Sequence, residues 1–152
     1  MAMIARLALT MTAVALFGGA AQASLGGGVD SIGVDSGHMA VRAHVVAAAS
    51  SGPVHTLTLA NGGTVKEYVT LSGTVFAISW QGPGKPDLRT LLGSHFDALQ
   101  IDNPIGRRHG IRRAPTVTRS DLQIATGGHP GAFWGFAWLP QIAPNGFNPS
   151  TP

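Results

Sequence analysis

The sequence predicts an α+β fold, in which an antiparallel sheet of about five strands has one amphipathic helix packed on one face. Residues 64–70 and 73–81 alternate in side-chain character and are rich in β-branched and aromatic residues, which is typical of half-buried strands. Apolar residues between 86 and 101 recur at the spacing of one helical stripe. A hairpin alone is marginally stable in water, so we expect the helix to cover it. The pattern leaves the strand order open.

The other strands follow from alternation and from the breakers between the segments. Residues 39–49 favour a strand, with a short Ala-rich helix as the alternative. Asn61-Gly62 is the strongest hairpin signal in the chain, and Gly73 supplies a second turn. Further strands are predicted at 54–60, 116–126 and 132–139.

The helix and its docking face are predicted from the same region. Asp87 stands where a helix N-cap favours a short acidic side chain, so helix 86–101 is expected to begin there. In strand 73–81, alternation places Phe76, Ile78 and Trp80 on one face. We expect the helix to pack on these three side chains.

The two ends of the chain are expected to differ from the domain between them. Residues 1–23 combine a basic residue, a short apolar run and small residues at a cleavage site, which is the pattern of a cleaved signal peptide. An uncleaved anchor is the alternative. Residues 24–37 are expected to form a loose Gly-rich arm, 38–140 a single α+β domain, and 141–152 a Pro-rich tail, extended or disordered at its end. The expected location is periplasmic or extracellular, with no membrane-spanning segment after cleavage.

The composition narrows the class of protein. The chain of 152 residues contains no Cys, so an exported fold of this sequence has no disulfides and is held by its core. The formal net charge of +3 does not by itself imply a nucleic-acid partner, and we expect none. No cofactor-binding motif stands out, and no cofactor is expected.

Most of the chain after the leader resembles a known family. The residues that carry the resemblance are Gly63–Val69, Gly73–Pro83, Pro86-Asp87-Leu88, Leu91-Leu92-Gly93, Phe96, Asp121-Leu122, Gly127-Gly128-His129, Ala132-Phe133, Gly135, Ala137 and Leu139-Pro140. In this pattern the chain is similar to the domain of unknown function 2844 family, which consists of small exported proteins found mainly in proteobacteria. The resemblance implies an exported protein and transfers no activity.

Glu67 and His129 are the two weak candidates for catalytic residues. Glu67 is the only Glu in the chain and lies mid-strand, where a buried carboxylate needs a partner or a raised pKa. An ion pair with an Arg, or an exposed strand face, is the alternative reading. His129 follows two glycines in a predicted turn. The six histidines show no metal-ligand spacing, and no metal site is expected, although zinc would be the default guess. No nucleophile motif is present.

Two further features suggest binding. The segment 106–113 contains four arginines that could hold an anionic glycan, a lipid headgroup or an acidic partner by charge: Arg107, Arg108, Arg112 and Arg113. A solvated loop is the alternative. Trp134, Phe136 and Trp138 share one face of the last strand, with Phe133 on the other. They are expected to belong to the core, or to an interaction patch if that face is exposed.

These observations favour a non-catalytic binding or accessory protein of the bacterial cell envelope. A small periplasmic hydrolase using Glu67 or His129 is one alternative. A polyanion binder acting through the loop 106–113 is another. The sequence leaves the partner, envelope protein or anionic glycan or lipid, and the oligomeric state open.

Overall fold

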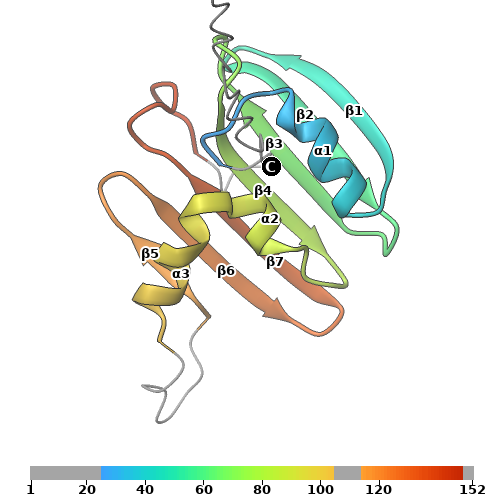
Figure 1. Ribbon diagram of the computed structural model, residues 1–152, viewed down its shortest axis with the longest axis vertical. Helices are drawn as coiled ribbons and strands as arrows, with labels where there is room; N and C mark the ends of the chain where they lie inside the picture. The colour runs from blue at the N-terminus through green and yellow to red at the C-terminus, as the bar shows by residue number, and fades with distance from the viewer. Residues whose placement is uncertain (1–24, 105–113, 149–152) are drawn as a thin grey trace, which may run out of the picture.

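The structure is a computed structural model that describes residues 25–104 and 114–148. It contains a seven-stranded antiparallel sheet of order β1-β2-β3-β4-β7-β6-β5 with helices on one face (Figure 1). The strands are β1 (Val41–Ala49), β2 (Gly52–Leu59), β3 (Thr64–Val69), β4 (Val75–Gly82), β5 (Thr116–Thr118), β6 (Gln123–His129) and β7 (Ala132–Trp138). The helices are α1 (Ser31–His38), α2 (Leu88–Leu92), the 3-10 helix η1 (Gly93–His95) and α3 (Phe96–Asp102).

The α+β class is confirmed, and the sheet is larger than expected. Residues 41–49 form a strand rather than the alternative helix. The segment 116–126 contains a turn, closed by a hydrogen bond from Arg119 N to Leu122 O of 2.9 Å, and therefore supplies two strands. The leader 1–23 lies outside the described residues.

Local sequence signals produced the two predicted hairpin turns. Gly62 adopts a φ of +85° and donates its N–H to Leu59 O at 3.0 Å, which closes the β2–β3 turn. Gly73 adopts a φ of +87° and donates to Thr70 O at 2.9 Å in the β3–β4 turn. Glycine reaches this left-handed region without the steric penalty of a Cβ, so these turns are encoded locally.

A β-bulge in β4 corrects the predicted face of Phe76. The register between β3 and β4 shifts by one residue after Tyr68, and Phe76 is the extra residue. Ile78 and Trp80 belong to the core under the helices, as predicted. The Phe76 ring is also buried, but it packs near Tyr68 on the opposite face, with ring centroids 6.4 Å apart. Strict alternation predicts the wrong face here because the extra residue of the bulge interrupts the alternation of side chains along β4.

The helical segment 86–101 is broken into three short pieces instead of one helix. Asp87 caps α2 as predicted, since its Oδ1 accepts hydrogen bonds from Arg89 N at 3.0 Å and Thr90 N at 3.3 Å. Gly93 follows α2 with a φ of +51°, outside the right-handed helical region. The chain then continues through η1 into α3 in a new direction, so that α2 and α3 cover different parts of the sheet (Figure 1).

The segment expected to be a loose arm is packed against the domain. Leu25 and Ile32 are buried in the core, and α1 lies on the sheet beside β1 and β2 (Figure 1). Leu25 N donates to Leu91 O at 3.0 Å, and Gly26 N donates to Val75 O at 2.8 Å. The loose-arm prediction is therefore wrong for residues 25–37. Burial of a few apolar side chains, together with these backbone hydrogen bonds, offsets the conformational entropy lost when this Gly-rich segment becomes ordered.

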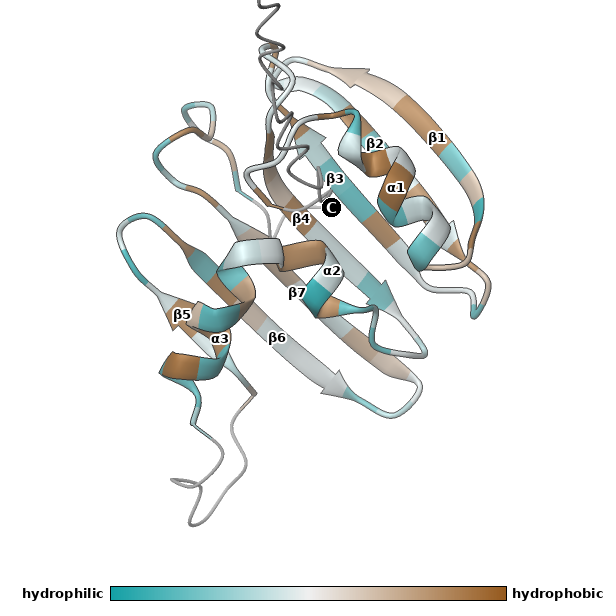
Figure 2. Cartoon of the chain, in the orientation of Figure 1, coloured by the Kyte–Doolittle hydropathy of each residue, from teal (hydrophilic) through white to brown (hydrophobic). Residues whose placement is uncertain are grey.

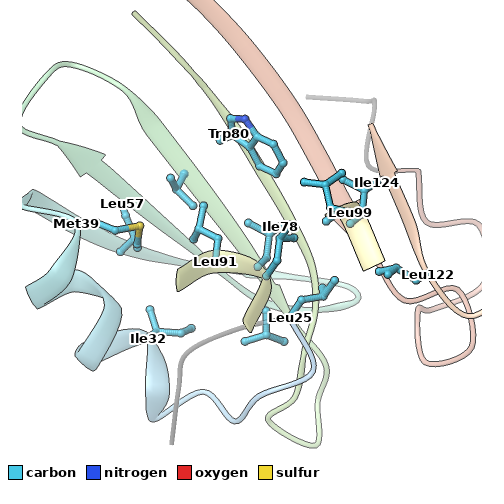
Figure 3. Close-up of a cluster of buried hydrophobic side chains, with 14 of the residues drawn as sticks. Leu25, Ile32, Met39, Leu57, Ile78, Trp80, Leu91, Leu99, Leu122 and Ile124 are labelled. Carbon is cyan, nitrogen blue, oxygen red and sulfur yellow. The ribbon is translucent and has the colours of Figure 1, made fainter. Parts of the chain in front are cut away.

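One hydrophobic core lies between the helices and the sheet. Figure 3 shows Leu25 and Ile32 of the N-terminal segment, Leu91 and Leu99 of the helices, and Ile78 of β4 contributing to the buried cluster. Its other members include Leu57, Val65, Trp80, Val117, Leu122, Ile124 and Ala137. The core therefore joins both halves of the sheet beneath one helical layer.

Trp80 and Gly135 form a cross-strand pair within this core. They lie opposite each other on β4 and β7. A Cβ on Gly135 would lie 2.2 Å from Cζ2 of Trp80, so the indole occupies the space above the glycine. The absence of a side chain at position 135 lets a large ring lie close to the sheet.

The two edges of the sheet differ. At the β5 edge, Asn103 Nδ2 donates to Thr116 O at 2.8 Å, and Thr116 N donates to Asn103 Oδ1 at 3.2 Å. The Asn103 side chain thus takes the place of a further strand. A two-point ion pair between Arg119 and Asp102, with a closest N···O distance of 2.6 Å, also ties α3 to this edge. In the described part of the chain, β1 has no comparable partner on its outer side.

Candidate functional site

An aromatic stripe occupies the face of the sheet opposite the helices. Trp134, Phe136 and Trp138 alternate along β7, so the three side chains project to the same side. Ala137 between them faces the core. Successive rings are attached roughly 7 Å apart, twice the rise per strand residue. The stripe is therefore a row of three aromatic positions on an open sheet face.

The neighbours of the stripe are small or neutral polar residues. The strand register gives these neighbours as Gln81, Ser79 and Ala77 of β4, and Gly127, Ala125 and Gln123 of β6. Trp138 Nε1 donates to Gln123 Oε1 at 3.3 Å, so one ring is oriented by an amide. No large aliphatic side chain of β4 or β6 lies beside the rings.

Trp134 lies flat on the sheet. It is directly opposite Gly127, and a Cβ at that glycine would lie 2.5 Å from Cζ2 and 2.6 Å from Cε2 of the indole. One face of the ring therefore rests on the backbone of β6. The side chain is 49% exposed, and it is the most exposed aromatic residue of the described chain. Its outer face is available to a flat apolar group.

The C-terminal segment covers the other end of the stripe. The Phe147 ring centroid lies 4.8 Å from that of Phe76, 5.2 Å from Tyr68 and 5.8 Å from Trp138. The end of the Pro-rich tail 141–152, predicted to be extended or disordered, lies partly outside the described residues, and Phe147 of the described part packs on the sheet. The open part of the stripe consequently comprises Trp134 and Phe136.

The charge on this face is sparse and positive. Lys66 lies opposite Ser79, and Ser79 lies opposite Phe136, which places all three in one row across the sheet. Among the residues that β2, β3, β4, β6 and β7 present on this side, Lys66 is the one Lys or Arg, and none is Asp or Glu. An anionic group would meet no carboxylate from these strands.

Glu67 lies on the opposite side of the sheet, beneath the helices. It is 1% exposed, and its Oε2 has no hydrogen-bond partner in the described structure. Burial, with the charge of Asp35 as a smaller contribution, raises the pKa of Glu67 to about 7. The alternative of an Arg ion pair is not observed among the described residues.

Asp35 of α1 is a second buried carboxylate that the sequence interpretation missed. It is 2% exposed, and its Oδ2 also has no partner in the described structure. Burial first, and then the charge of Asp87, raises the pKa of Asp35 to about 7. Only the docking of α1 reveals this residue, because in the sequence it lies in a Gly-rich stretch.

Two histidines lie near Glu67. His55 is directly opposite Glu67 on β2, and the His44 Nε2 to His55 Nδ1 distance is 3.0 Å, so one imidazole donates to the other. Burial and the neighbouring His44 lower the pKa of His55. Among residues 25–104 and 114–148, no group of three or more potential ligands is arranged to hold a metal ion.

The two predicted catalytic candidates are far apart. Glu67 lies in the row of Ile78 and Ala137, whereas His129 lies in the row of Ala132. Ala132 and Ala137 are five residues apart on β7, so the two rows are separated by roughly 17 Å along the strands. His129 is exposed at the β6–β7 turn, and its Nδ1 lies 3.0 Å from Pro130 O. The arrangement does not bring the two side chains into one site. The four arginines of the segment 106–113 lie outside the described residues.

The comparisons with known proteins identify a family. A family model described as "Protein of unknown function (DUF2844)" matches residues 21–151. Comparison with curated proteins and with solved structures gave no match. No described helix is both long and apolar enough to cross a bilayer. Because the family model spans nearly the whole chain, the protein belongs to the DUF2844 family.

Proposed function

We propose that this protein is a non-catalytic, exported binding protein of the cell envelope that holds an acidic glycan on its aromatic stripe. The observation that carries the proposal is Trp134, a half-exposed indole resting flat on Gly127 with its outer ring face open. Contiguous exposed apolar patches often mark ligand-binding or interaction sites, and Trp134 adjoins the partly buried Phe136 on the same face.

The chemistry of the stripe matches that of a sugar chain. A sugar ring presents C–H groups on its flat faces and hydroxyls at its rim. Aromatic rings with an open face accept the apolar side, and neighbouring amides and hydroxyls fix the orientation. Trp134 and Phe136 supply the rings, with Gln81 and Ser79 beside them. Lys66 lies in the Phe136 row and would pair with a sugar carboxylate.

The same face is less suited to nucleic acid. Binding to single strands combines stacking with a basic groove that follows the backbone. These strands present Lys66 alone among Lys and Arg. Sparse positive charge favours a ligand whose charges are widely spaced, such as a polysaccharide with a carboxylate on every second sugar.

The proposal is for binding without cleavage. Glycoside hydrolysis usually requires two carboxyl groups on either side of the scissile bond. The strands β2, β3, β4, β6 and β7 present no carboxylate beside the stripe. Glu67 lies on the other side of the sheet beneath the helices. The alternative of a hydrolase using Glu67 or His129 therefore receives no support from the arrangement around the stripe.

Affinity electrophoresis in gels containing hyaluronate, in which every second sugar carries a carboxylate, or neutral dextran tests the proposal. We expect retardation by the acidic polysaccharide, and a Kd about tenfold weaker for Trp134→Ala and for Phe136→Ala, equivalent to about 1.4 kcal/mol each. Phe133→Ala is the matched control, because Phe133 lies on the other face of β7 and contacts Lys85. Circular dichroism spectra establish that each variant is folded.

Three outcomes contradict the proposal. The first is no retardation in the gel that contains the acidic polysaccharide. The second is equal binding by wild type and both stripe variants. The third is loss of binding on neutralising the arginines of segment 106–113 while the stripe variants bind normally, which would assign binding to that segment instead. The variant that tests the third outcome carries Arg107→Gln, Arg108→Gln, Arg112→Gln and Arg113→Gln.

A further inference from the structure

Within residues 25–104 and 114–148, no strand pairs with the outer edge of β1. β1 is the first strand of the sheet order and has nine residues, Val41–Ala49. Residues 42–49 are all exposed, and β1 contributes brown, hydrophobic segments at the edge in Figure 2. Val45 and Val46 project to opposite faces and are 61% and 53% exposed. The strand thus exposes a valine on each face, and one of its edges is unpaired in the part of the chain that the structure describes.

Sheet edges in native proteins are usually protected. Short strands, prolines, charges or a covering segment prevent one sheet from pairing with another. The opposite edge of this sheet follows that rule, since β5 has three residues and Asn103 hydrogen-bonds to the backbone N–H and C=O of Thr116. β1 contains no proline, and its one Lys or Arg is Arg42. Its register irregularity lies at the extreme start, between Val41 and Ala43.

We propose that β1 pairs antiparallel with β1 of a second copy of this chain, joining the two sheets into one. The unpaired backbone N–H and C=O groups of an edge strand can accept an added strand as partner in place of water. A two-fold symmetric pair that uses all nine residues is centred on Val45. It places Val45 opposite Val45 of the second copy, Arg42 opposite Ala48, and His44 opposite Val46.

The chemistry of β1 suits this self-pairing. In the Val45-centred register no like charges lie opposite each other, which avoids the repulsion that would oppose a symmetric pair. The exposed valine on one face meets its own symmetry mate, so apolar surface becomes covered on that face. The described residues of β1 carry no carboxylate that would repel an approaching edge.

Sedimentation velocity over a range of protein concentrations tests for the dimer. We expect a reversible monomer–dimer equilibrium in the wild type and at least a tenfold weaker association for Val45→Lys, which places two ammonium groups opposite each other. Ser120→Lys is the control, because Ser120 is an exposed residue beyond β5. A wild type that stays monomeric overturns the proposal, as does a dimer that Val45→Lys leaves unchanged.

Disulfide trapping tests the register independently. The chain contains no Cys, so a single introduced cysteine can form a disulfide only with another molecule. In the proposed pair the two Cβ atoms at position 45 are about 5 Å apart, close to disulfide geometry. Val45→Cys should therefore cross-link several-fold faster than Val46→Cys, whose side chain is similarly exposed but faces His44 of the second copy. Equal rates, or a faster rate at position 46, would overturn the Val45-centred register.

Discussion

Replacing Glu67 by glutamine should remove much of the dependence of stability on pH. Glu67 is buried without a partner for Oε2 in the described structure, and its pKa rises from 4.5 to about 7. At about 1.36 kcal/mol per pKa unit, ionising this group in the folded protein costs about 3 kcal/mol. That is a large share of the 5–15 kcal/mol by which domains are usually stable.

The sign of the effect follows from proton binding. Below about pH 4.5 the Glu67 carboxyl is protonated in both states and adds no pH dependence. Between about pH 4.5 and 7 the unfolded chain loses this proton while the folded protein keeps it, so the free energy of unfolding decreases as the pH rises. Above about pH 7 the folded protein carries the full penalty. Asp35, whose pKa is also raised to about 7, should act in the same direction.

Urea unfolding followed by tryptophan fluorescence between pH 4.5 and 8.5 measures this dependence. The wild type should lose stability across the window, and Glu67→Gln should show a slope shallower by about 3 kcal/mol over the same range. Asp97→Asn is the matched control, because Asp97 is an exposed carboxylate on α3. If Glu67→Gln and wild type keep parallel curves, the reasoning about burial is refuted.

Three further substitutions test the packing. Gly135→Ala should cost about 1–3 kcal/mol in urea unfolding, because its Cβ would meet the indole of Trp80 at 2.2 Å; an unchanged midpoint would contradict this close approach. Asn103→Ala should cost about 1–2 kcal/mol and speed hydrogen exchange at the Thr116 amide, since both hydrogen bonds to that residue are lost; unaltered exchange would argue against edge protection. Gly33→Ala in α1 should stabilise the protein by up to about 1 kcal/mol and so raise its melting temperature, because the added Cβ enters open space and alanine favours the helix. A lower melting temperature would mean that α1 is not docked as described.

The sequence predicted which side chains of the candidate site share a face, but not whether that face is exposed. Alternation correctly placed Trp134, Phe136 and Trp138 on one face and Phe133 on the other, because strand geometry fixes the side of each residue. Alternation says nothing about which face is covered, and that depends on where the helices dock. The flat placement of Trp134 needed the register between β6 and β7, which sets Gly127 opposite it.

The buried carboxylates show the same division. Mid-strand placement of Glu67 between valines suggested a partner or a raised pKa if the side chain is buried, and the structure buries it, which raises its pKa to about 7. Asp35 gave no such signal, because its neighbours in sequence are small and its burial comes from the contact of α1 with distant strands. No local pattern could have revealed that the charge of Asp35 contributes to the raised pKa of Glu67.

The sequence by itself determined the α+β class, the turns at Gly62 and Gly73 and the cap at Asp87. These features depend on backbone conformations and hydrogen bonds within a few residues. The tertiary structure alone decided the side of Phe76, the packing of α1, the Asn103 edge and the open β1 edge. Each of these results from contacts or missing contacts between segments far apart in the chain, and the free energy of such contacts depends on the whole arrangement of the sheet and its helices.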